Sequence, residues 1–208
     1  MNRPLQRPSK IVCVGRNYRE HAKELGNEVP KEPLIFLKPP SSVIGDGDPI
    51  VLPPQSKQVE HEGEIGIVVG RPLHRASRSE AGGAVRGVVA LNDVTARDLQ
   101  RSDSQWTRAK GFDTFCPIGQ MGDAPNDLTG LTVITRVNGK ERQRATAAEM
   151  VFDVPELLAY ISQVMTLEPG DVVATGTPSG VGTLAPGDVV EVEVLGISRV
   201  RNPVEMES

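Results

Sequence analysis

Three carboxylates in the chain have the types and spacing of a metal site. Glu62 and Glu64 lie two residues apart in HEGEIGIVVG, and Asp93 ends the apolar run VRGVVALND. Side chains two apart on a strand share a face, so the two glutamates repel each other unless a cation lies between them. Oxygen ligands favour Mg²⁺ or Mn²⁺, with Ca²⁺ as a substitute, over zinc. The alternative is an exposed edge strand, but the apolar run after Glu64 is typical of a strand buried on both faces.

A histidine and a glutamate three residues apart, His21 and Glu24 in HAKE, form a second candidate site. Residues with this spacing are neighbours on a helix, so Glu24 could orient the imidazole of His21. A histidine oriented by a carboxylate is a suitable general base for activating water. Taken alone, the spacing favours an exposed pair without a catalytic role.

Two polar segments follow Asp93: residues 95–100 (TARDLQ) and residues 106–113 (WTRAKGFD), which include the only tryptophan. A lysine such as Lys110 in a carboxylate-rich site can stabilise a developing enolate or oxyanion. The alternative is a solvated loop. We expect surface positions for three charged residues of this region: Arg101, Asp103 and Arg108.

The segment TGTPSGVG at residues 175–182 is rich in glycine and hydroxyl groups. It lacks the Gly-Lys-Ser/Thr ending of a phosphate-binding loop, so nucleotide binding is not predicted. Its glycines and threonines would let backbone N–H groups and a hydroxyl approach a small anionic ligand. A plain tight turn is the alternative. His74, in a polar segment, is interpreted as a surface residue.

Composition limits the class of protein. The chain has 208 residues, 38% of them hydrophobic, which is enough for one packed domain. A net charge of −4 and scattered basic residues argue against nucleic-acid binding. No apolar segment is long enough for a membrane span or a signal peptide, so we expect a cytoplasmic protein. Cys13 and Cys116 are interpreted as buried free thiols rather than a disulfide.

The elements that must position these residues are mainly strands. Apolar and β-branched runs predict strands at Ile11–Gly15, Leu34–Leu37, Ile50–Leu52, Glu64–Gly70 and Val85–Leu91. Apolar and polar residues alternate along Leu131–Asn138, and Asn138-Gly139 at the end of this stretch is a strong hairpin signal. PGDVV occurs twice, each time as a predicted turn that leads into a strand.

Two helices are predicted beside the strands. The pattern of Asn17–Leu25 predicts a short helix, with Gly26 in the usual position after a helix end. A second helix starts at the cap Asp153, with Pro155 in its first turn. We therefore expect an α+β, predominantly β fold, with residues 1–10 as an N-terminal extension and 11–208 as one catalytic domain.

Several blocks, in order, resemble the fumarylacetoacetate hydrolase family: VGRNYREHAKE, FLKPPSSVIG, HEGEIGIVVG, NDVTARDLQ, WTRAKGFDTFCPIG and GDVVATGTPSGVG. The nearest likeness is to the compact single-domain branch, which contains acylpyruvate hydrolases and oxaloacetate decarboxylases. The resemblance implies a mixed β-sandwich or roll, a homodimer, and Mg²⁺ or Mn²⁺ held by three carboxylates. It also implies a lid segment over the site.

Residue roles follow from the same resemblance. The metal ligands fall on Glu62, Glu64 and Asp93. The catalytic positions fall on His21, Glu24 and Lys110, and the substrate contacts on Arg16, Gln100 and Thr177.

The implied substrate is a small 2-oxo acid. The main expectation is hydrolysis of the C–C bond of acylpyruvates such as acetylpyruvate or fumarylpyruvate, through a pyruvate enolate. The alternative is an oxaloacetate decarboxylase or a 2-hydroxyhepta-2,4-dienedioate-type isomerase or decarboxylase of aromatic catabolism. Because the chain lacks the additional N-terminal domain of longer members, fumarylacetoacetate itself is not the expected substrate. A non-catalytic module that binds a metal or a small acid is the remaining alternative.

Overall fold

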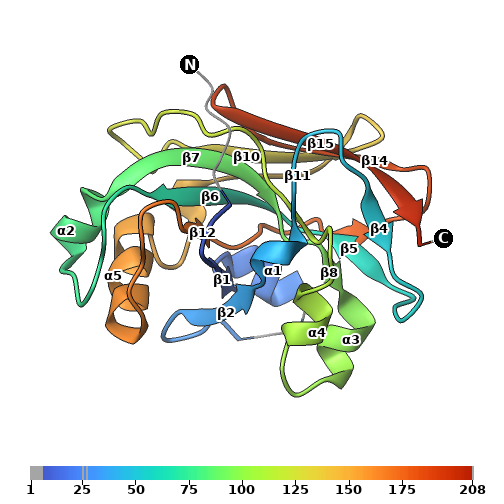
Figure 1. Ribbon diagram of the computed structural model, residues 1–208, viewed down its shortest axis with the longest axis horizontal. Helices are drawn as coiled ribbons and strands as arrows, with labels where there is room; N and C mark the ends of the chain where they lie inside the picture. Colours follow the sequence, from blue (N-terminus) through green and yellow to red (C-terminus); the bar gives the residue numbers. More distant parts are fainter. Residues whose placement is uncertain (1–6, 25, 27, 208) are drawn as a thin grey trace.

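The computed structural model describes residues 7–24, 26 and 28–207 and shows a β-sandwich with short helices around it (Figure 1). The first sheet has the order β2-β1-β12-β6-β7. Its strands span Leu34–Lys38 (β2), Ile11–Gly15 (β1), Val172–Ala174 (β12), Gly63–Val69 (β6) and Val85–Asn92 (β7). The second sheet has the order β11-β10-β14-β15-β4. Its strands span Lys140–Thr146 (β11), Thr132–Val137 (β10), Val189–Val194 (β14), Ser198–Met206 (β15) and Ile50–Leu52 (β4).

Smaller elements surround the sandwich. A three-stranded sheet and a two-stranded sheet contain Gly182–Thr183 (β13), Val59–His61 (β5), Thr95–Ala96 (β8), Val43–Ile44 (β3) and Cys116–Pro117 (β9). The helices are Arg19–Glu24 (α1), Arg78–Gly82 (α2), Arg97–Ser102 (α3), Thr107–Lys110 (α4) and Val154–Val164 (α5), with 3₁₀ turns at Pro40–Ser42 and Ala147–Glu149. The predicted α+β, predominantly β fold is therefore confirmed.

Strands β6 and β7 form the centre of the sandwich. Every residue of β6 is buried, and so are the last six residues of β7. Strand β6 packs against β10 of the second sheet, and β7 packs against β14 and β15. One apolar core joins both sheets and contains, for example, Ile67 and Val192. The apolar runs of these strands are continuous because both faces are covered.

The predicted turns are present. Asn138 and Gly139 both have positive φ angles, 52° and 77°, as a two-residue hairpin between β10 and β11 requires. Each PGDVV segment begins with a turn at its glycine and continues into a strand. The turn at Gly170 (φ 93°) leads into β12, and the turn at Gly187 (φ 88°) leads into β14. These glycines adopt a conformation that other residues reach only at a cost.

Helix α5 begins as predicted, because Asp153 accepts a hydrogen bond of 3.0 Å from the backbone N–H of Glu156. The other predicted helix, Asn17–Leu25, is wrong at its start, since α1 spans Arg19–Glu24. The side chain of Asn17 instead exchanges hydrogen bonds with the backbone of Phe152, which ties the chain to a distant loop before the helix begins. Leu25 lies outside the described residues.

Cys13 and Cys116 are buried free thiols, as predicted. Burial raises the pKa of both, that of Cys116 to about 12. His74 is exposed, also as predicted. No helix within the described part of the chain has the length and apolar character needed to cross a membrane.

Candidate metal centre

The ends of β6 and β7 bring the three carboxylates together. Gly63 of β6 lies opposite Asn92, the last residue of β7. The side-chain oxygen of Asn92 accepts from the backbone N–H of Glu62 at 3.0 Å, and the N–H of Asp93 donates to the carbonyl of Glu62 at 2.8 Å. Glu62 thus sits just before β6 rather than within it, while Glu64 is the second residue of the strand. These two hydrogen bonds place Asp93 beside both glutamates.

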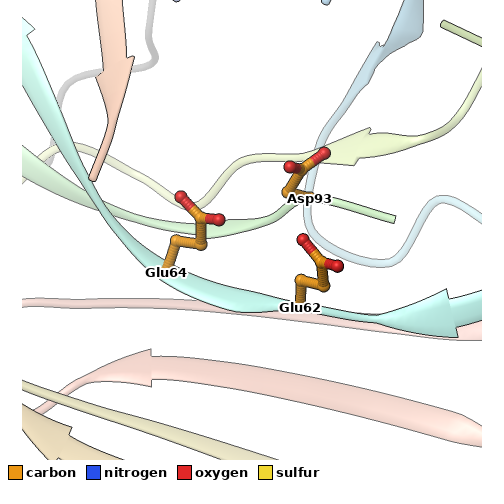
Figure 2. A group of neighbouring side chains, drawn as sticks. All are labelled: Glu62, Glu64 and Asp93. Carbon is orange, nitrogen blue, oxygen red and sulfur yellow. The ribbon is translucent and has the colours of Figure 1, made fainter. Parts of the chain in front are cut away.

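The three carboxyl groups converge in the interior of the molecule. Figure 2 shows the carboxyl groups of Glu62, just before β6, and of Glu64, within it, pointing toward Asp93. One oxygen from each lies within 4.8 Å of the others, and Glu62, Glu64 and Asp93 are only 4%, 2% and 1% exposed. Three buried carboxylates at this separation need compensating positive charge.

Three cationic side chains supply part of that charge. The Lys110 ammonium donates to Glu62 at 2.8 Å and to Asp93 at 2.6 Å. Lys38 donates to the other oxygen of Asp93 at 2.6 Å. Arg97 forms an ion pair with Glu62. All three cations are themselves buried, so each pair is screened little by solvent.

Glu64 lacks such a partner. Its carboxylate accepts a hydrogen bond of 2.8 Å from the N–H of Gly176, but no basic nitrogen of the described residues lies within 4.0 Å of it. Burial raises the pKa of Glu64 well above its usual value, and the charges of Asp93 and Glu62 add to the effect. A hard divalent cation held by the three carboxylates would compensate this charge, so the residues fit Mg²⁺ or Mn²⁺.

Glu62 shows the opposite behaviour. Burial alone would raise its pKa, but the Lys110 ammonium and the Arg97 guanidinium hold the pKa of Glu62 well below its usual range. Glu62 is therefore a permanent carboxylate. The centre combines one stably charged ligand with one, Glu64, whose charge depends on a cation.

A pocket of about 430 Å³ opens onto the carboxylates. It is lined by every site residue predicted from the sequence: Arg16, His21, Glu24, Glu62, Glu64, Asp93, Gln100, Lys110 and Thr177. Phe36 and Trp106 form part of its wall, and their rings meet edge to face at 5.3 Å between centroids. Residues from distant parts of the chain thus share one cavity.

The predicted pair of His21 and Glu24 is formed. Nδ1 of His21 lies 3.2 Å from the Glu24 carboxylate, and His21 is buried while Glu24 is partly exposed. Both carboxylate oxygens of Glu24 also accept from the backbone N–H of Gly180, at 3.0 and 3.2 Å. The loop at residues 175–182 therefore holds Glu24 in place, which leaves the Nε2 atom of His21 for a ligand or water.

Thr177 lines the pocket, but its hydroxyl is already occupied. The hydroxyl donates to the carbonyl of Gly63 at 2.9 Å and accepts from the side chain of Gln143 at 2.8 Å. A substrate contact by Thr177 stays a prediction, and it would have to use the backbone N–H or exchange one of these bonds. The observed bonds tie the loop to the start of β6.

Sequence reasoning missed Lys38, Arg97 and Arg101. Lys38 ends the apolar strand of the FLKPP motif, a position where a charge is unusual and could have been noticed. Arg97 lies in the NDVTARDLQ block, where the sequence predicted roles for Asp93 and Gln100 but not for Arg97. Arg101 was expected on the surface; it is exposed, but it also lines the pocket, while Asp103 and Arg108 pair with each other outside it.

The chain is similar to several known proteins along most of its length. The chain is 44% identical to the mitochondrial oxaloacetate decarboxylase of Dictyostelium discoideum, over 95% of this chain and 94% of that protein. It is 45% identical to the mitochondrial oxaloacetate tautomerase of Caenorhabditis elegans, over 88% of each. The structure of a 5-carboxymethyl-2-hydroxymuconate delta-isomerase from Mycobacterium smegmatis superposes with a TM-score of 0.89 at 45% identity, covering 97% of this chain and 80% of that one.

These relatives bear the names of enzymes, and they support the decarboxylase and isomerase alternative better than acylpyruvate hydrolysis. Residues 10–205 match the family described as fumarylacetoacetate (FAA) hydrolase C-terminal. The match covers nearly the whole chain. The protein therefore belongs to the fumarylacetoacetate hydrolase family.

Proposed function

We propose that the protein is a Mg²⁺- or Mn²⁺-dependent enzyme that forms the enolate of a small 2-oxo acid, with oxaloacetate as the substrate type. The reaction would be decarboxylation or keto–enol tautomerisation. The observation that carries the proposal is the position of the Lys110 ammonium, which bonds to Glu62 and Asp93 at the base of the pocket beside the uncompensated Glu64.

A bound divalent ion would supply Lewis-acid polarisation of the keto group and the carboxylate next to it. The protein adds Lys110. Burial opposes its charge, but Asp93 and Glu62 raise the pKa of Lys110 above its usual value, so the side chain is an ammonium and not a base. An ammonium has three N–H donors, and the two carboxylates use two of them. The third can bond to an oxygen that becomes negative as the enolate forms.

Gln100 can orient the substrate through its amide N–H groups. Its carbonyl oxygen accepts a hydrogen bond from Arg97, and this bond fixes the amide so that its N–H groups are free to donate. Arg97 is itself held by Glu60 at 2.7 Å and by Glu62. Substrate orientation and metal ligation are therefore coupled through one guanidinium group.

The same enolate explains the different names of the relatives. Loss of CO₂ from oxaloacetate leaves the electron pair of the broken bond on C3, which is pyruvate enolate. Transfer of a C3 proton to water instead leaves oxaloacetate enolate, and protonation of its oxygen by water completes the tautomerisation. Both reactions need the negative charge on the former keto oxygen to be stabilised, and neither needs a hydrolytic water.

Acylpyruvate hydrolysis is a second candidate, favoured by the bonds from His21 through Glu24 to Gly180. With Nδ1 oriented by Glu24, Nε2 of His21 could take a proton from water. That water would attack the distal carbonyl, and the C–C bond would break to release pyruvate enolate. Only this reaction requires the His21–Glu24 pair.

The test is an activity assay with Mg²⁺ or Mn²⁺ on oxaloacetate, acetylpyruvate and fumarylpyruvate. Ultraviolet absorbance follows the enol form, and a coupled assay follows pyruvate. Lys110→Met should lower kcat about 100- to 1000-fold with every substrate, as for loss of one preorganised donor. Glu24→Ala should abolish acylpyruvate cleavage and spare oxaloacetate conversion. Full activity of Lys110→Met, with folding checked by circular dichroism, would refute the proposed role.

A further inference from the structure

The pocket contains four basic side chains, which fall into two kinds. Lys110 and Arg97 are buried and neutralised by the carboxylates Glu60, Glu62 and Asp93. Arg16 and Arg101 line the same pocket, yet no carboxylate in the described part of the chain lies within 4.0 Å of the guanidinium group of either. The pocket therefore offers two uncompensated positive charges.

Arg16 is held in an unfavourable backbone conformation. It follows β1 with a φ of 60°, in the left-handed region that costs a non-glycine residue about 1–2 kcal/mol. Surrounding structure must enforce such a conformation, and sites of this kind concentrate around ligands. Arg16 is half-buried and lines the pocket.

Arg101 reaches the pocket from a different element, the last turn of α3. One guanidinium nitrogen donates to the side-chain oxygen of Gln58 at 3.2 Å, and Gln58 in turn donates to Glu60 at 2.6 Å. The bond to Gln58 uses one of five N–H donors, so the forked edge of the group stays available to a carboxylate. By contrast, Arg108 of the next helix is paired with Asp103 and does not line the pocket.

We propose that Arg101 is a specificity-determining residue that binds the distal carboxylate of a dicarboxylic 2-oxo acid. Two free guanidinium groups match the two negative charges of such a substrate, and a monocarboxylic 2-oxo acid would leave one of them unused. The inference deepens the proposed function and rests on it. It selects oxaloacetate-type diacids over acetylpyruvate-type monoacids.

A binding experiment tests this selectivity without turnover. L-malate and L-lactate are 2-hydroxy acids that differ by one distal carboxylate, and isothermal titration calorimetry in Mg²⁺ measures the Kd of each. The unmodified protein should bind malate more tightly than lactate. Arg101→Met should weaken malate binding about 10- to 100-fold, the worth of a charge-assisted bidentate contact, and leave lactate binding unchanged. Arg101→Lys should recover part of the loss.

Arg108→Met is the matched control, because it removes one positive charge from the same region outside the pocket. It should leave both affinities unchanged, whereas a loss equal to that of Arg101→Met would mean that general electrostatics is responsible. The inference would be overturned if the unmodified protein bound malate no more tightly than lactate. It would also be overturned if Arg101→Met weakened the binding of both acids equally.

A catalytic measurement separates this inference from the proposed function. Oxaloacetate and pyruvate also differ by the distal carboxylate, and exchange of C3 protons in D₂O reports enolisation of pyruvate by NMR. Arg101→Met should lower kcat/KM for oxaloacetate and leave pyruvate exchange unchanged. If oxaloacetate is not converted but malate binding still depends on Arg101, the proposed reaction fails and the specificity inference stands. If oxaloacetate is converted equally well by Arg101→Met, the specificity inference fails alone.

Discussion

Gly63 separates Glu62 from Glu64, and its missing side chain is a structural requirement of the candidate metal centre. A Cβ atom added to Gly63 would lie 1.8 Å from Oγ1 and 3.1 Å from Cβ of Thr135, which projects from β10 of the second sheet. Thr135 is fully buried, and its branched side chain has few rotamers to choose from. The Gly63→Ala variant must therefore push β6 away from β10.

Overpacking of this kind costs about 1–3 kcal/mol of unfolding free energy. For a domain of this size, each kcal/mol lowers Tm by about 2–4 °C. The shift also moves Glu62 and Glu64 relative to Asp93, which directly follows the neighbouring strand β7. We expect Mn²⁺ affinity to fall about 10- to 100-fold, the range for changes that disturb ligand orientation.

The Thr135→Ala variant provides the matched background. The Thr135 hydroxyl has no hydrogen-bond partner within the described structure, so its removal should cost little by itself. In the Thr135→Ala background the contact with Oγ1 of Thr135 is gone. The loss of unfolding free energy caused by Gly63→Ala should therefore fall by at least half. Thermal unfolding and Mn²⁺ titration of the unmodified protein, the two single variants and the double variant measure the coupling between the two positions. Equal costs of Gly63→Ala in both backgrounds would refute the steric argument.

Three further predictions concern the charges around the site. Because folding raises the pKa of Glu64, the folded metal-free protein retains a proton that the unfolded chain releases, so stability falls as pH rises above the ordinary value of 4.5. Glu64→Gln should therefore raise Tm of the metal-free protein at neutral pH and abolish the further rise that Mg²⁺ produces; a lower Tm would contradict this. Lys38→Met leaves one oxygen of buried Asp93 without its cation and should cost about 3 kcal/mol in chemical denaturation, whereas exposed Lys57→Met should be neutral. Because burial raises the pKa of Cys116 to about 12, iodoacetamide at pH 8 should label this thiol only in denaturant, as read by mass spectrometry.

The local parts of the site could be predicted from the sequence. Glu62 and Glu64 are two residues apart, and the strand period alone places them on one face. His21 and Glu24 are a helical spacing apart, and their contact follows from α1 without further information. Patterns of this kind depend on backbone geometry over a few residues, which the sequence encodes directly.

The counter-charges could not be predicted in this way. Lys38 contacts Asp93 across 55 residues of sequence, and Arg97 contacts Glu62 across 35. The position of a lysine at the end of an apolar strand does not indicate which carboxylate it will contact in the fold. The same holds for Arg101 and Arg108, which are seven residues apart in the sequence: Arg101 lines the pocket, whereas Arg108 pairs with Asp103 outside it.

The sequence by itself determined the main strands, the helix that starts after Asp153, the carboxylates that could hold a metal and the family of the chain, because strand and helix periods and ordered motifs are local properties. Only the tertiary structure decided the balance of charge in the pocket. The fold buries Lys38, Lys110 and Arg97 against carboxylates. Among the residues that the structure describes, it leaves Glu64 without a basic partner and leaves Arg16 and Arg101 without a carboxylate partner. Charge compensation acts through space over a few ångströms, so it depends on which distant segments the fold brings into contact.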